Sequence, residues 1–151
     1  MEIEMKAVGV VQNSLDRAPI SGAWRVAWKE VISQIVVRSE FAPALDGIEA
    51  FSHLFILFWL HKVSEEERRT YRIHPSNNTS FPLVGAFATR TRHRPNPIGI
   101  SVVQLVEVRS NVLLVKGLDA VDGTPVLDIK PYVPAFDLPL EEVRTGPWVN
   151  L

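Results

Sequence analysis

Eleven prolines divide the 151-residue chain into short segments, and this spacing limits what the chain can fold into. Several of them cluster between Pro75 and Pro97, and others between Pro125 and Pro147. Because proline lacks a backbone donor and breaks the interior of a helix, long helices are excluded from these regions. Short apolar segments between such breaks favour β-strands.

The apolar segments have the polarity patterns of strands. Residues 31–38 alternate between apolar and polar, whereas residues 54–60 are apolar on both faces, which is typical of a central strand. One short helix is expected over residues 64–70, with Ser64 as its N-cap and glutamates in its first turn. The pattern predicts a mainly β fold: a compact, mostly antiparallel β-barrel with one or more short helices. The other expected strands are residues 6–11, 83–89, 101–108, 111–118 and 126–130.

Composition indicates one ordered domain over residues 1–151, because hydrophobic residues make up 46% and charged residues 22%. The chain has no cysteine, which excludes disulfides and cysteine nucleophiles. Its first residues are acidic and unlike a signal peptide, and the apolar stretch of residues 51–60 is too short to span a bilayer. We therefore expect a cytoplasmic protein without membrane contact.

Several kinds of chemistry are excluded by spacing. No two glycines stand as G-x-G, so neither a Rossmann fingerprint nor a phosphate-binding P-loop can form. The chain also lacks the G-x-S-x-G and H-E-x-x-H motifs, and its four histidines have no metal-ligand spacing. No metal is expected.

The densest unusual cluster covers residues 85–99. Its three arginines, Arg90, Arg92 and Arg94, alternate along the chain before a double-proline turn, and Gly99 is expected to permit a strained exit. Arginine suits phosphate or carboxylate because its planar fork binds both oxygens. A solvated basic turn is the simpler alternative. Since the net charge is −1, any contact with RNA must be made through a local patch such as this one.

Two further clusters hold polar residues in apolar surroundings. Asp128 lies inside an apolar strand, where a carboxylate is costly unless it is paired, so an arginine partner is expected. A ligand-binding role for Asp128 is an equal alternative. His53 stands near Glu49 and aromatic residues, and a satisfied core histidine is the simpler interpretation.

Three stretches resemble the TsaA/TrmO family, also called YaeB-like proteins. They are GIEAFSHLFILFWLH at residues 47–61, GAFATRTRHRPNPIGIS at 85–101 and LDAVDGTPVLDIKPYVP at 118–134. The opening strand of the family is similar to GVVQNS at residues 9–14. The combination of A-T-R-x-x-x-R-P-N-P-I-G with D-G-T-P-V-x-D-I-K-P-Y is highly specific, and the matching stretches cover most of the chain.

The resemblance implies a small non-Rossmann β-barrel methyltransferase that uses S-adenosylmethionine. Members of the family form homodimers, with the cofactor pocket near the subunit interface. The best-understood bacterial type methylates N6 of threonylcarbamoyl-adenosine at position 37 of certain tRNAs. This chain is expected to be a single domain that lacks the C-terminal domain of long bacterial members, and tRNA and a second copy are its expected partners.

The resemblance, together with the chemistry of methyl transfer and of arginine, indicates roles for individual residues. Asp122 and Asn96 are the candidate catalytic groups, because a hydrogen-bond acceptor on the adenine amino group would make N6 a better nucleophile. Arg92, His93 and Arg94 are expected to bind RNA. The expected cofactor-binding residues are Pro19, Ile20, Ser21, His61, Lys62, Arg90, Ile100, Asp119, Ala120, Val121 and Asp122.

Two other functions are compatible with the same sequence. One is a methyltransferase that acts on a small-molecule acceptor, which the acidic balance would suit. The other is a non-catalytic dimeric module that binds a nucleotide-like ligand. Binding of tRNA should weaken steeply with salt, whereas binding of a small neutral acceptor should not.

Overall fold

The computed structural model describes residues 1–15 and 28–149. These residues form two compact units. The barrel unit comprises residues 1–62 and 98–132, and the arginine-rich unit comprises residues 63–97 and 133–151, each within the described ranges. Each unit is described separately below.

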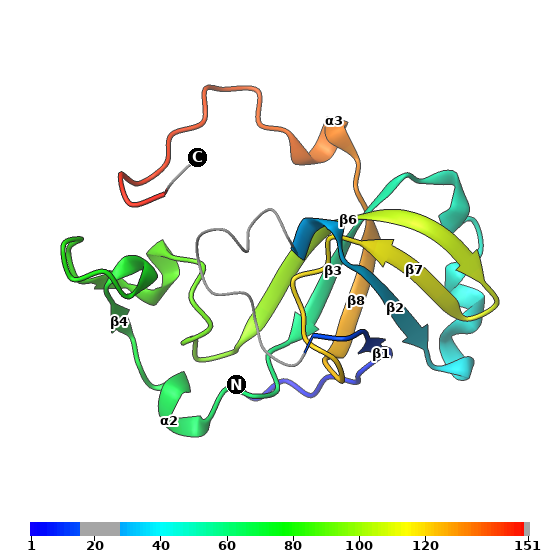
Figure 1. The fold of residues 1–151 in the computed structure, drawn as a ribbon, viewed down its shortest axis with the longest axis horizontal. Helices are drawn as coiled ribbons and strands as arrows, with labels where there is room; N and C mark the ends of the chain where they lie inside the picture. The colour runs from blue at the N-terminus through cyan, green and yellow to red at the C-terminus, as the bar shows by residue number, and fades with distance from the viewer. Residues whose placement is uncertain (16–27, 150–151) are drawn as a thin grey trace. The chain divides into compact units, whose positions relative to one another are not determined.

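The barrel unit is a closed antiparallel barrel in the order β1-β2-β7-β6-β3-β8 (Figure 1). The closure joins β1 to β8 through the pairs Gly9↔Val126 and Val10↔Pro125. This architecture confirms the predicted mainly β, non-Rossmann fold. The strands are β1 (Gly9–Gln12), β2 (Ile32–Val37), β3 (His53–Trp59), β6 (Ile98–Arg109), β7 (Val112–Lys116) and β8 (Pro125–Pro131).

The core follows from alternation along the strands. In β2, Ser33, Ile35 and Val37 are buried while the residues between them are exposed or half-buried. Strand β3 lies between β6 and β8, as expected for the central strand, and its inward side chains are fully buried. Its outward residues Phe55, Leu57 and Trp59 are half-buried, which explains why the segment is apolar on both faces. The inward residues of β3 are Leu54, Ile56 and Phe58.

Glycine is required at position 99 for a reason other than the predicted one. It lies within β6 and is absent from the glycines with positive φ, so the expected strained exit is wrong. A Cβ at this position would lie 2.2 Å from Cε2 of Phe58, whose ring packs across the glycine from the neighbouring strand. The position therefore requires glycine for packing against the core.

The arginine-rich unit contains short elements. Helix α2 (Glu65–Arg68) begins at Ser64, whose hydroxyl accepts the N–H of Glu67 while the Glu67 carboxylate accepts the N–H of Ser64. This capping box confirms the predicted N-cap. The other elements of the arginine-rich unit are β4 (Arg72–Ile73), η4 (Pro75–Asn77), β5 (Val84–Gly85), η5 (Ala86–Ala88) and α3 (Pro134–Asp137). The barrel unit also contains the 3-10 helices η1 (Trp28–Glu30), η2 (Ser39–Leu45) and η3 (Ile48–Ala50).

The predicted strand over residues 83–89 is largely wrong. Only Val84 and Gly85 form a strand, and the chain then turns into η5. Both the N–H and the hydroxyl of Thr89 donate to the carbonyl of Ala86, which replaces a strand ladder with a local turn.

Throughout the described ranges, no helix has the length and apolar character needed to cross a membrane.

Candidate functional site

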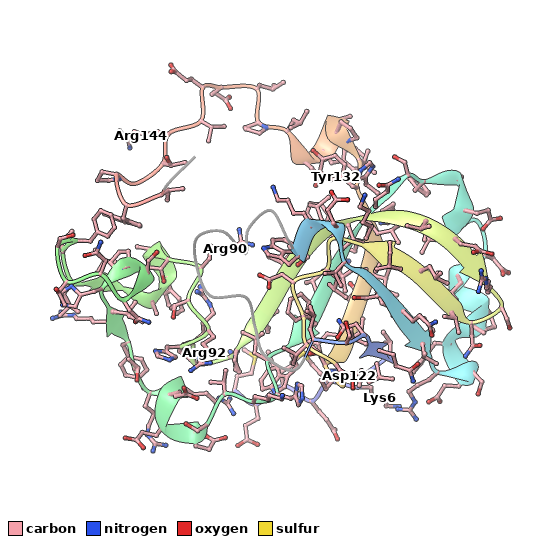
Figure 2. The ribbon with its side chains drawn as sticks, in the orientation of Figure 1. Lys6, Arg90, Arg92, Asp122, Tyr132 and Arg144 are labelled. Atoms are coloured by element: carbon pink, nitrogen blue, oxygen red, sulfur yellow. The ribbon has the colours of Figure 1, made fainter. Side chains whose placement is uncertain are left out.

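Four of the predicted cofactor residues lie in the loop between β7 and β8, which we call the aspartate loop (residues 118–124). Ala120 and Val121 are 3% and 8% exposed, so their side chains belong to the barrel core, whereas Asp122 is exposed. The N–H of Asp119 donates to Oγ of Ser101 at 3.3 Å, which attaches the loop to β6. Asp122 is labelled in Figure 2, and its loop comes directly before β8 in the chain. Since the side chains of Ala120 and Val121 are buried, a ligand would meet these two residues through their backbone.

Asn13 holds the aspartate loop in place, although the sequence analysis did not single it out. Its side-chain amide donates to the carbonyl of Ala120 at 2.8 Å and to Oγ of Ser33 at 3.0 Å. Its backbone N–H donates to Oδ1 of Asp122 at 3.0 Å, and its Oδ1 accepts the N–H of Leu15. The signal in the sequence was Ser33, a polar residue at an inward position of an alternating strand.

The structure brings His61 to the aspartate loop. Gly123 turns the loop with φ +81°, and a Cβ on it would lie 3.9 Å from Nε2 of His61. Ile100 is 42% exposed and lies on the outer face of β6, whereas the neighbouring Ser101, which accepts the hydrogen bond from Asp119, is buried. Lys62 follows His61 directly. Part of the predicted cofactor set therefore lies together in the barrel unit.

Five further predicted residues, Arg90, Arg92, His93, Arg94 and Asn96, lie in the arginine-rich unit, on a loop that we call the arginine loop (residues 89–97). Arg94 is half-buried, and its Nη1 donates to the carbonyls of Ala86, Thr89 and Thr91 at 3.1, 3.0 and 3.3 Å. An arginine held by three backbone acceptors fixes the path of the chain around it. This organising role of Arg94 was not foreseen from the sequence.

Threonine side chains shape the same loop. Thr89 Oγ1 accepts the N–H of Thr91, and Thr91 Oγ1 accepts the N–H of His93, each at 3.2 Å. These two successive turns leave Arg90 and Arg92 exposed on the coil before β6, where Figure 2 marks both. The predicted alternating presentation of arginines therefore holds for Arg90 and Arg92, while Arg94 is directed into the loop.

Glu67 joins α2 to the arginine loop. Its Oε1 lies 3.0 Å from Nη2 of Arg92 and 3.5 Å from Nε2 of His93. The N–H of Ser64 is the main reason why the pKa of Glu67 is below its ordinary value; Arg92 and His93 lower this pKa further, and burial opposes them. Arg68 adds a second link, since its Nε donates to the carbonyl of Pro95 at 2.9 Å.

Two sequence predictions outside the loops are wrong. Asp128 pairs with Lys130 at 2.9 Å rather than with an arginine, because residues two apart on β8 share its outer face. His53 is exposed rather than in the core, and its Nδ1 shares a 2.8 Å hydrogen bond with Oγ of Ser52. It occupies an outward position at the start of β3, where burial is incomplete.

The remaining predicted residues are dispersed. Pro19, Ile20 and Ser21 lie outside the described residues. Asn96 is exposed in the arginine loop, and so the two candidate catalytic residues, Asn96 and Asp122, belong to different units. Within residues 1–15 and 28–149, no group of three or more histidine, aspartate or glutamate side chains is arranged to hold a metal ion.

Comparison with known proteins places this arrangement in context. A protein of Methanothermobacter thermautotrophicus, named a probable S-adenosyl-L-methionine-binding protein, is 42% identical over 140 residues, which cover 91% of this chain and 95% of that protein. The tRNA (adenine(37)-N6)-methyltransferase of Escherichia coli is 50% identical over 97 residues, covering 62% of this chain and 41% of the enzyme. The crystal structure of TrmO from Pseudomonas aeruginosa aligns with a TM-score of 0.75 and 32% identity, over 97% of this chain and 63% of that one.

The coverage shows which part of the longer relatives is matched. The chain spans nearly the whole archaeal relative but less than half of the Escherichia coli enzyme. The model of the tRNA-methyltransferase O N-terminal domain matches residues 13–138, a range that includes Asn13, the arginine loop and the aspartate loop. The chain therefore belongs to the tRNA-methyltransferase O N-terminal domain family.

Proposed function

We propose that the chain is an S-adenosylmethionine-dependent methyltransferase that acts on an adenine of tRNA. The observation that carries this proposal is the 50% identity to the Escherichia coli tRNA (adenine(37)-N6)-methyltransferase over 97 residues. The S-adenosyl-L-methionine-binding name of the archaeal relative, which has almost the same length, supports the methyl donor independently. A role in tRNA modification would place the protein in the cytoplasm.

The finer proposal is that the acceptor is N6 of threonylcarbamoyl-adenosine at position 37. The threonyl group carries a carboxylate, and an arginine fork binds a carboxylate through two parallel hydrogen bonds. Arg90 and Arg92 are exposed on a loop whose path is fixed by Arg94 and by two threonine turns. In this proposal Arg92, with His93, contacts the RNA, and Arg94 serves it by holding the loop.

The donor set of the chain fits S-adenosylmethionine, which supplies an activated methyl group when bound. Arg90 suits its carboxylate, and the carboxylates of Asp119 and Asp122 suit its ammonium and ribose hydroxyls. The half-exposed side chain of Ile100 offers apolar surface for an adenine ring. Pro19, Ile20, Ser21, His61, Lys62, Ala120 and Val121 complete the proposed set.

Asp122 and Asn96 are proposed for the acceptor side. An adenine N6 that accepted a methyl group would lose one proton. An Asp122 carboxylate can take that proton, whereas an Asn96 amide oxygen can only accept a hydrogen bond from N6. Because Asn13 donates to Oδ1 of Asp122, the carboxylate is held in a fixed orientation.

The proposed function is tested by separating binding from transfer. Calorimetric titration with S-adenosylmethionine should give saturable binding, and Arg90→Ala should weaken it about 10-fold to 100-fold through the loss of a charge-assisted contact. Arg109→Ala is the matched control, since Arg109 is exposed and forms an ion pair with the nearby Glu107 in β6. Transfer of a labelled methyl group is then measured on tRNA with and without the threonylcarbamoyl group.

The outcomes distinguish the competing functions. Methyl transfer to modified tRNA alone supports the finer proposal, and transfer to both tRNAs restricts the proposal to the adenine. Binding of S-adenosylmethionine without transfer to any tRNA contradicts tRNA methylation and favours a small-molecule acceptor or a binding module. Equal binding by Arg90→Ala and Arg109→Ala contradicts the role given to Arg90.

We also propose that the protein is a homodimer. The outer face of β6 exposes the large apolar side chains Ile98, Ile100, Val102 and Val106, which are 38%, 42%, 45% and 48% exposed. An apolar stripe along one strand is typical of an interface. Val102→Glu should convert a dimer into a monomer in sedimentation equilibrium, whereas Ile32→Glu, at a 47% exposed position on β2, should not. A monomeric wild-type protein would contradict the dimer.

A further inference from the structure

Two aromatic side chains of the arginine-rich unit are largely exposed. Phe87 is 80% exposed and Tyr71 is 62% exposed. A single exposed apolar residue needs no explanation, but two exposed aromatic residues whose backbones are brought close by strand pairing mark a candidate surface for a ligand. The N–H of Ala86, next to Phe87, donates to the carbonyl of Tyr71 at 2.8 Å and continues the β4–β5 pairing.

Phe87 is supported by a fixed cation. Cζ of Arg94 lies 5.7 Å from the centroid of the Phe87 ring, within the range of a cation–π contact. Arg94 cannot swing away without losing its bonds to the carbonyls of Ala86, Thr89 and Thr91. The ring is thus preorganised, which lowers the entropy cost of stacking a planar ligand on it.

The charge around these rings indicates the chemistry of the ligand. Residues 63–97 contain six arginines against three glutamates, in a chain whose net charge is −1. Arg69, Arg72, Arg90 and Arg92 are exposed there, and the ion pair of Arg92 with Glu67 leaves a positive excess. Exposed rings interleaved with arginines are what single-stranded nucleic acid requires: faces for the bases and cations for the phosphates.

We propose that Phe87 and Tyr71 form a platform on which unpaired RNA bases stack, while the arginines around them contact the phosphates. The proposal rests on the proposed function and deepens it, because it names the part of the RNA that is recognised. A duplex hides the faces of its bases, so the platform selects a loop or an unpaired end. Arg94 acts as a positioning residue under Phe87.

The test measures binding of the full-length chain to three labelled RNAs: an oligoadenylate, a hairpin carrying an anticodon loop, and a blunt duplex. Phe87→Ala should weaken binding of the first two RNAs about 5-fold to 150-fold and leave duplex binding unchanged. Phe87→Trp should retain the affinity because its ring also stacks. Phe136→Ala is the matched control, since Phe136 is 86% exposed in α3 of the same unit but is followed by acidic Asp137.

Salt dependence separates stacking from charge. Phe87→Ala should leave the slope of log affinity against log salt unchanged, whereas Arg72→Gln should reduce that slope by about one. The proposal is overturned if the wild type binds neither single-stranded RNA, if Phe87→Ala binds like Phe136→Ala, or if it loses duplex binding equally. It is also overturned if Phe87→Ala loses S-adenosylmethionine and keeps RNA. Stacking on Phe87 without methyl transfer would overturn the proposed function and retain the platform.

Discussion

Gly99→Ala should destabilise the barrel by about 1–3 kcal/mol, the cost of overpacking a well-packed core. A Cβ on Gly99 would lie 2.2, 2.5 and 2.8 Å from three ring carbons of Phe58, closer than any real contact. Phe58 is 2% exposed, so its ring cannot yield without disturbing the core. Urea unfolding at constant slope measures the loss in the free energy of unfolding.

A double-mutant cycle with Phe58→Leu isolates the clash as the cause. Leucine removes the ring atoms that the new Cβ would meet, so Gly99→Ala should cost less in the Phe58→Leu background than in the wild type. Phe58→Leu alone creates a cavity and sets the baseline. Equal costs in both backgrounds would contradict the packing explanation for this glycine.

Asn13→Asp should destabilise the protein by about 1–3 kcal/mol and weaken S-adenosylmethionine binding as well. Aspartate keeps the acceptor for the N–H of Leu15 but removes both amide donors, which serve Ala120 and buried Ser33. The carbonyl of Ala120 would then face a carboxylate oxygen at the distance of a former hydrogen bond. Since these bonds hold the aspartate loop, both stability and binding should fall.

The neighbouring residue supplies the control for this variant. Gln12 is exposed at the end of β1, so Gln12→Glu makes the same chemical change without removing a bond to the aspartate loop. Calorimetry and urea unfolding on both variants give the comparison. If Asn13→Asp bound S-adenosylmethionine as tightly as Gln12→Glu did, the aspartate loop would have no part in the S-adenosylmethionine site.

The strands were predictable because alternation is a local property of the sequence. Residues 31–38 and 54–60 carry the inward and outward pattern that the barrel uses, and Ser64 carries its capping role within one turn. At residues 83–89 the local pattern led to a largely wrong prediction of a strand. The residues of this segment favour a strand, but the side chain of Thr89 donates a hydrogen bond to the carbonyl of Ala86, which a strand ladder would otherwise use.

The candidate site was predictable by residue type and less so by role. Arginines in a stiff loop indicate anion binding, but nothing in the sequence separates Arg94, which binds three carbonyls, from exposed Arg90 and Arg92. The role of Asn13 was hidden because its two partners in the aspartate loop, Ala120 and Asp122, lie about a hundred residues away in the chain. Long-range hydrogen bonds of this kind leave no periodic signal.

The seam between β1 and β8 couples the candidate site to the order of folding. The two strands stand near opposite ends of the barrel unit's sequence, and their register comprises the two pairs Gly9↔Val126 and Val10↔Pro125. Joining two strands so far apart in the chain costs loop-closure entropy, and few backbone pairs offset that cost. We therefore expect the β1–β8 pairing to form late in folding. The same seam carries Asn13 and the aspartate loop to each other. The hydrogen bonds from Asn13 to the aspartate loop should therefore form when β1 pairs with β8, and a chain whose barrel has not closed would have strands without this arrangement of the loop.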